Sequence, residues 1–154
     1  MNRKKRLILQ GGLTLLWTAV IFLFSLQPAK QSASLSGGLL QALLGWIYAV
    51  TTVEIPIALV HNLFRKMAHF AEFLVLGMFS GAFSNSLLEK RSPALIYGGA
   101  IALLDETLQF ITGEGRAMRF SDMLIDFSGV LVAVGLLTAL SKFSAKTKKG
   151  VLPK

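Results

Sequence analysis

The chain has 154 residues, of which 53% are hydrophobic and 16% are charged, and it contains no cysteine. Soluble domains carry about 25% charged residues, so this composition argues against a soluble domain and against a disordered chain. The lack of cysteine excludes disulfides and thiolate metal sites, and the length leaves room for one domain, residues 1–154. The formal net charge of +8 raises the question of a nucleic-acid partner, but no aromatic platform accompanies the basic clusters, and we expect none.

Four stretches are long and apolar enough to cross a bilayer, whose core of about 30 Å requires about 20 residues of helix. The predicted spans cover residues 7–26, 67–88, 93–111 and 122–141. The first follows the basic run Arg3 to Arg6. A basic run also precedes the apolar region of cleaved signal peptides, but the apolar region here is longer than theirs, so we interpret it as a membrane anchor. In the second, Gly77 and Gly81 form a small-xxx-small pair that would allow close packing on a neighbouring helix, with flexible or merely space-filling glycines as the alternative. The third opens at Ser92-Pro93, a typical helix start.

A further stretch, residues 35–53, also lacks charge until Glu54. Its bulky apolar residues, such as Leu39, Leu43 and Ile47, recur at helical spacing and form an amphipathic stripe. We interpret residues 38–50 as a helix lying in the membrane interface, with a fifth span as the alternative. The predicted fold class is therefore all-α, an integral membrane bundle of four transmembrane helices plus one interfacial amphipathic helix between helices one and two.

The distribution of charge favours four spans. With four, one side of the membrane holds eleven basic residues and one acidic residue, and the other side holds five basic and seven acidic residues. Basic residues collect on the cytoplasmic side, so both termini are predicted to be cytoplasmic. A fifth span would instead place the two basic ends of the chain on opposite sides.

Polar residues inside the spans fall at similar heights when they are counted from the cytoplasmic helix ends at 1.5 Å per residue. Glu72 and Asp105, for example, lie about 24 Å and about 20 Å from those ends. Ionisable groups within a span are costly, so they face the bundle interior and mark functional sites. These residues form a polar layer in the outer third of the bilayer, with Lys66 one turn before His69 and Arg116 in the loop directly above it. The predicted site consists of Ser25, Gln27, Lys66, His69, Glu72, Asp105, Glu106, Gln109, Arg116, Asp122 and Asp126.

The segments that carry this layer resemble the signature segments of VanZ-like membrane proteins. They are Phe24 to Pro28, Arg65 to Phe73, Asp105 to Gln109, and a last stretch with Gly115-Arg116, Phe120-Ser121-Asp122, Asp126 and Gly129. The resemblance implies a protein of the bacterial cell envelope, in the cytoplasmic membrane, with a link to resistance to the glycopeptide antibiotic teicoplanin. Two residues depart from the family pattern: Glu114 replaces the usual proline of the loop, and Asp126 replaces a common asparagine.

Three interpretations of the polar layer are open, and membrane lipids are expected partners in all of them. In an enzyme, His69, Glu72 and Asp105 would be catalytic, as a general base and its orienting partners, and the other layer residues would bind a lipid-linked cell-wall precursor. A divalent cation held by the carboxylates would suit such chemistry. In a binding or accessory protein, the layer would capture a polar head group or a lipoglycopeptide. In a structural protein, the charges would only form an ion-pair network that locks the helices together.

Overall fold

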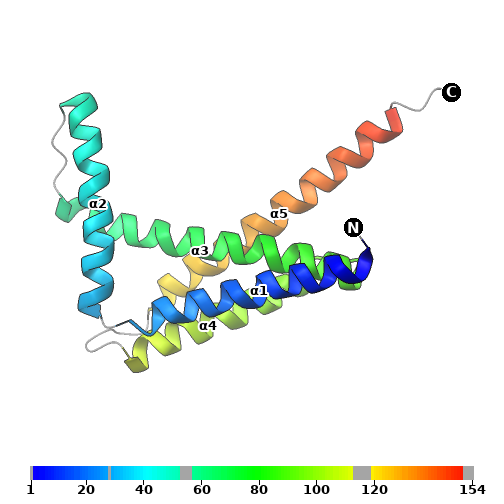
Figure 1. Ribbon diagram of the computed structural model, residues 1–154, viewed down its shortest axis with the longest axis horizontal. Helices are drawn as coiled ribbons and strands as arrows, with labels where there is room; N and C mark the ends of the chain where they lie inside the picture. The colour runs from blue at the N-terminus through cyan, green and yellow to red at the C-terminus, as the bar shows by residue number, and fades with distance from the viewer. Residues whose placement is uncertain (1, 28, 53–56, 113–118, 151–154) are drawn as a thin grey trace.

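The computed structural model describes residues 2–27, 29–52, 57–112 and 119–150, which form five helices (Figure 1). These are α1 (Arg3–Ser25), α2 (Ala29–Thr51), α3 (Ile57–Leu88), α4 (Pro93–Thr112) and α5 (Phe120–Gly150). Within the described residues, α1, α3, α4 and α5 are long and apolar enough to cross a membrane, and α2 contributes a shorter apolar helix, Gly37–Thr51. The predicted all-α fold, with four spans and an intervening shorter helix, is confirmed.

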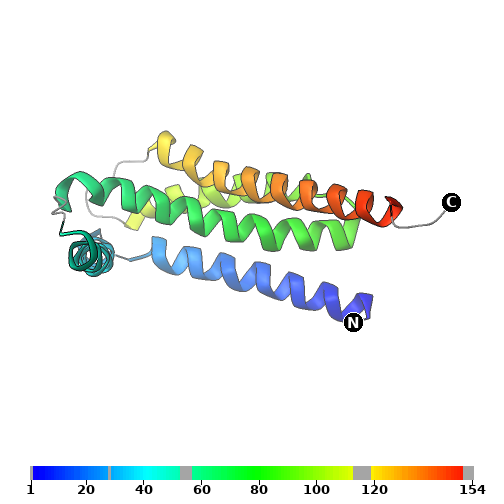
Figure 2. The same cartoon turned by 90° about the horizontal axis from the view of Figure 1, so that it is seen from above.

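The four long helices run alongside one another, and α2 lies across one end of the bundle (Figures 1 and 2). The start of α1 and the last turns of α5 lie at the opposite end. Helix α2 is roughly perpendicular to the four long helices. If those helices span a membrane, α2 lies roughly parallel to the membrane surface, which is the orientation expected of an interfacial helix.

Three helices extend nine or ten residues beyond the apolar runs that predicted them. Helix α3 begins at Ile57 rather than at residue 67, because the charged pair Arg65-Lys66 interrupts the hydropathy but not the helix, and no proline or glycine intervenes before Gly77. Helix α5 likewise continues through the basic residues beyond Ser141. Helix α2 begins at Ala29 rather than at residue 38. Helix α4, by contrast, begins at Pro93 as predicted.

Small residues bring α3 and α5 into backbone contact, and this pair of helices forms the most extensive interface in the fold. A Cβ atom added to Gly129 would lie 2.5 Å from the carbonyl oxygen of Phe70, and one added to Gly77 would lie 2.8 Å from the Cα of Val130. A Cβ on Gly81 would lie 3.0 Å from a side chain of α5. The prediction that Gly77 and Gly81 support close helix packing is confirmed.

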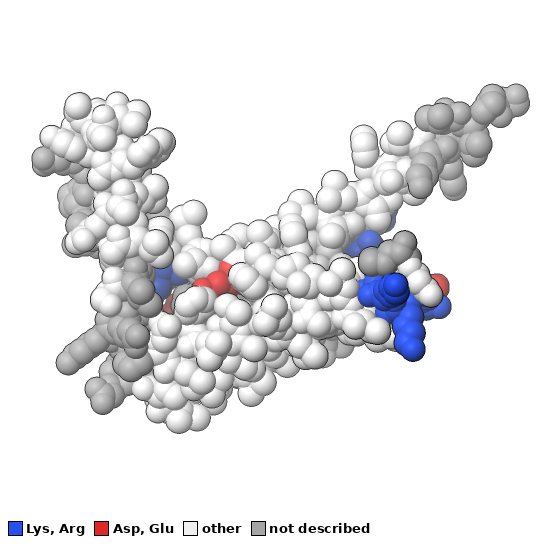
Figure 3. Space-filling view, in the orientation of Figure 1, with Lys and Arg blue, Asp and Glu red and all other residues white. Residues whose placement is uncertain are grey.

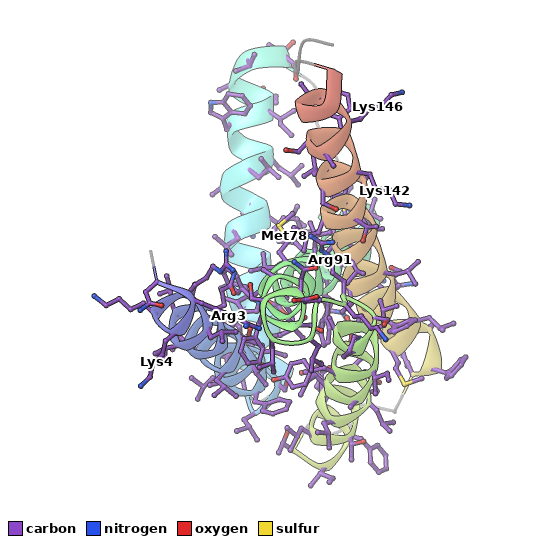
Figure 4. All side chains as sticks on the ribbon, turned by 90° about the vertical axis from the view of Figure 1, so that its right-hand side faces the viewer. Arg3, Lys4, Met78, Arg91, Lys142 and Lys146 are labelled. Carbon is purple, nitrogen blue, oxygen red and sulfur yellow. The ribbon has the colours of Figure 1, made fainter. Side chains whose placement is uncertain are left out.

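Charge is separated along the bundle. Figure 3 shows an acidic patch close to the end that α2 crosses, and basic residues concentrated at the opposite end. Figure 4 looks onto that basic end, where Arg3 and Lys4 come from the start of α1, Arg91 from the turn before α4, and Lys142 and Lys146 from the last turns of α5. We call the end crossed by α2 the acidic end.

Candidate functional site

Asp105 lies in the second half of α4 and is 1% exposed. Ser25, the last residue of α1, donates a hydrogen bond from its hydroxyl to one carboxylate oxygen of Asp105, and Gln109 Nε2 donates to the other at 2.7 Å. The hydroxyl of Thr112 donates to the Ser25 carbonyl oxygen at 3.3 Å and ties the end of α1 to α4. As their i, i+4 spacing predicts, Asp105 and Gln109 lie on the same face of α4.

Facing sides of α3 and α5 carry a ladder of charged groups at the acidic end. Arg65 Nη2 lies 3.9 Å from Asp122 Oδ2, and one turn further along both helices His69 Nδ1 lies 3.7 Å from Asp126 Oδ1. His69 Nδ1 also lies 4.0 Å from Glu72 Oε2. Because both pairs advance by four residues, the two helices run in the same direction and keep one register here.

Burial distinguishes the carboxylates of this end. Asp126 is 1% exposed, and neither of its carboxylate oxygens accepts a hydrogen bond from any described residue. Glu106 is also buried, but it accepts a hydrogen bond from the backbone N–H of Arg119. The side chain of His69 is 23% exposed and therefore connects the buried carboxylates to the outside of the bundle. Asp126 is the carboxylate here whose burial is not offset by hydrogen bonds.

The other predicted site residues fall into different positions. Gln27 follows the end of α1 and is half-buried. Lys66 is exposed, and the basic group of the ladder is its neighbour Arg65. Arg116 lies outside the described residues. The structure thus brings together Ser25, His69, Glu72, Asp105, Gln109 and Asp126, with the Arg65–Asp122 pair beside them.

Sequence reasoning did not select Arg65, Thr112 or Trp17 for the site. Arg65 precedes His69 by four residues and Lys66 precedes it by three. Both spacings allow a residue to share the helix face of His69, so spacing alone does not distinguish Arg65 from Lys66. Trp17 of α1 donates from its indole nitrogen to the backbone carbonyl of Glu72 at 2.9 Å. A backbone acceptor leaves no signal in the sequence, and this contact required the structure.

Three residues of the cluster have the chemistry and the proximity for a metal ion. His69, Asp105 and Asp126, from α3, α4 and α5, each offer one ligand atom, and these atoms lie within 4.8 Å of one another. An imidazole nitrogen and carboxylate oxygens are ligands of divalent transition metals. The same arrangement of a base beside carboxylates also suits proton transfer.

A separate cavity of about 260 Å³ lies toward the basic end, between α1, α3 and α4. Its walls are almost entirely apolar and include Gly11, Leu15, Phe83, Leu87 and Tyr97. Of the predicted site residues that the structure describes, none lines this cavity. The cavity and the polar cluster are therefore distinct features of the bundle.

Comparison with known families gives one finding that bears on the whole bundle. A family model described as VanZ/LLP1 matches residues 12–141. The match contains all four segments in which the sequence resembles VanZ-like proteins, and it confirms that resemblance. Comparison with curated proteins and with solved structures finds no match.

Proposed function

The chain belongs to the VanZ/LLP1 family of multi-pass membrane proteins, and from this premise we propose that its acidic end binds the polar head of a lipid-linked molecule of the bacterial cell envelope. The head group would enter beside α2 and contact the cluster of Ser25, His69, Glu72, Asp105, Gln109 and Asp126. Carboxylates and an amide accept hydrogen bonds from sugar hydroxyls and peptide N–H groups, whereas Arg65 and the exposed Lys66 suit a phosphate.

The burial of Asp105 and Asp126, each 1% exposed in a span, is the observation that carries this proposal. A carboxylate at the centre of a membrane helix costs about 2.5–3.5 kcal/mol on insertion scales. A purely structural role would be filled as well by apolar residues, since replacing buried ionic groups with well-packed hydrophobic ones is often neutral or stabilising. A site for a polar ligand explains why two helices retain these carboxylates at one level.

The charge separation along the bundle supports an orientation for this site. The basic end, with both chain ends, would face the cytoplasm of a bacterial cytoplasmic membrane, and the acidic end would face outward. Helix α2 would then lie at the outer membrane interface, where lipid-linked cell-wall precursors and lipoglycopeptide antibiotics are both within reach. We include teicoplanin resistance in the proposal on the family likeness alone.

Catalysis is a second candidate, and the position of His69 favours it. Its Nδ1 lies 3.7 Å from a buried carboxylate and 4.0 Å from Glu72, and its side chain is partly exposed. An imidazole held by carboxylates serves as a general base toward a water molecule at a phosphate or an ester. Asp105 would then orient the imidazole of His69 or the substrate, in addition to binding the head group.

Binding of defined lipids to purified protein tests the proposal. We would compare a polyprenyl diphosphate-linked disaccharide with the neutral polyprenol, using native mass spectrometry, and follow phosphate release in the same samples. The variants are Glu72→Gln and Asp105→Asn, and Glu89→Gln, at the other end of α3, is the matched control for loss of one negative charge. We expect binding of the disaccharide-linked lipid to fall at least about tenfold in the two site variants, because the carboxylate acceptors are weakened, and to be unchanged in the control.

Circular dichroism and a cellular assay decide between the interpretations. Normal helicity with lost lipid binding in both site variants supports a site, and time-dependent phosphate release by the wild type favours the enzyme over the binding protein. Loss of folded protein in both variants would instead support a helix-locking network. Equal teicoplanin susceptibility of bacteria with and without the expressed chain would remove antibiotic resistance from the proposal.

A further inference from the structure

The cluster at the acidic end contains three groups whose arrangement resembles the protein ligands of a metal ion. His69, Asp105 and Asp126 come from three different helices, and one ligand atom of each lies within 4.8 Å of the other two. In a tetrahedral site with metal–ligand distances of 2.0–2.2 Å, ligand atoms are about 3.3–3.6 Å apart. The separation of 3.7 Å between His69 Nδ1 and Asp126 Oδ1 is close to this value, and shifts of about 1 Å would bring ligand atoms that are 4.8 Å apart into the same range.

The surroundings of Asp126 give an independent indication of a cation site. Its side chain is 1% exposed, and both carboxylate oxygens are buried without a hydrogen bond from any residue in the described part of the chain. Buried carboxylates in proteins are normally hydrogen-bonded, paired or bound to a metal. The neighbouring Glu106 accepts a hydrogen bond from a backbone N–H and Asp122 pairs with Arg65, whereas Asp126 faces the imidazole of His69 at 3.7 Å, beyond hydrogen-bond distance, and that imidazole is itself a candidate metal ligand.

The surroundings of Asp105 are those of an oriented metal ligand. Ser25 donates to one of its carboxylate oxygens and Gln109 to the other, so the carboxylate is held from α1 and from its own helix. Each carboxylate oxygen can accept a hydrogen bond with one lone pair and bind a cation with the other. Hydrogen bonds of this kind fix the direction of metal ligands and tune their affinity.

We propose that His69, Asp105 and Asp126 bind a Zn²⁺ ion. One imidazole and two carboxylates suit zinc better than magnesium or calcium, which prefer oxygen ligands alone. Three protein ligands leave a fourth position for water or for an oxygen of a bound molecule. The inference rests on the proposed function in one respect: the ion would give an acidic cluster its means of attracting the phosphate of a lipid-linked head group.

The test measures zinc without any lipid. The full chain is purified in detergent through a tag that contains no histidine, treated with a chelator, and titrated with Zn²⁺, Mg²⁺ and Mn²⁺. Bound zinc after desalting is counted by elemental analysis, and the unfolding temperature is recorded with and without each ion. We expect one Zn²⁺ per chain and a higher unfolding temperature with zinc, because an ion that binds only the folded state stabilises it.

Variants locate the ion. His69→Gln and Asp126→Asn should each weaken zinc binding at least about 100-fold, and Ser25→Ala, which removes only an orienting hydrogen bond, about 10–100-fold. Glu89→Gln should bind zinc as the wild type does. Asn is isosteric with Asp and removes a buried charge that lacks hydrogen bonds, so Asp126→Asn is expected to fold.

Two results would overturn the zinc site: a wild-type protein that retains no zinc and shows no thermal shift, or His69→Gln and Asp126→Asn variants that bind zinc normally. The first does not depend on the folding of any variant. Binding of the polyprenyl diphosphate-linked disaccharide by chelator-treated protein, together with no zinc binding, would refute the metal site and leave the proposed function standing. Zinc binding without lipid binding would refute the proposed function and leave the metal site.

Discussion

Replacement of Gly129 by alanine should separate the two helices that carry the charged ladder. The added Cβ would lie 2.5 Å from the Phe70 carbonyl oxygen and 2.9 Å from the Leu74 nitrogen, and both are backbone atoms of α3. A backbone atom cannot rotate away, so α3 and α5 must move apart by roughly 1 Å to restore an ordinary contact. Gly129 is three residues from Asp126, and the same movement would draw Asp126 away from His69.

The size of the effect follows from packing. A radial gap of about 0.5–1 Å forfeits a quarter to a half of the dispersion energy of each contact across it. Overpacking a close-packed interior by one methyl group typically costs about 1–3 kcal/mol. Because the obstruction is backbone on one side and the α3–α5 interface is the largest in the fold, we expect about 2–3 kcal/mol of lost stability. This is about a 30- to 150-fold loss in the ratio of folded to unfolded protein.

The control lies on the same helix. A Cβ on Gly135 has no atom within 4 Å, so Gly135→Ala should leave stability unchanged or raise it slightly through helix propensity. Stability would be measured by reversible unfolding of both variants in mixed detergent micelles, followed by circular dichroism. If Gly129→Ala proved as stable as Gly135→Ala, the close approach of α3 and α5 at this glycine would be wrong.

Two further predictions concern the ladder and the topology. Arg65→Met should cost about 0.5–1 kcal/mol of stability through loss of the partly exposed ion pair with Asp122, with a smaller loss at high salt, whereas Lys66→Met should be nearly neutral. Equal effects of the two variants in the same unfolding assay would contradict the assignment of Arg65 to the ladder. Reporter enzymes fused after Arg91 and after Arg119 should report opposite sides of the membrane, with the Arg91 fusion active in the cytoplasm. Matching signals would rule out α4 as a span.

The amino-acid sequence alone predicted which segments are long and apolar enough to cross a membrane, and that their polar residues fall at similar heights along the helices. Apolar run length is a local property, and the rise of 1.5 Å per residue converts a position such as Asp105 into a height without knowledge of its neighbours. Local spacing also predicted the hydrogen bond between Gln109 and Asp105, because residues four apart share one face of a helix. The family resemblance, carried by short segments in order, was likewise available from the sequence.

Only the tertiary structure decided which side chains at that height meet. Consecutive residues on a helix point about 100° apart, so Arg65 and Lys66 have nearly the same height but different directions, and local rules allowed either to face the carboxylates. The choice depends on the rotation and register of α3 against α5. Those are set by small residues such as Gly77 and Gly129, far apart in sequence, that let the two backbones touch. The pairing of His69 with Asp126 is a consequence of that contact.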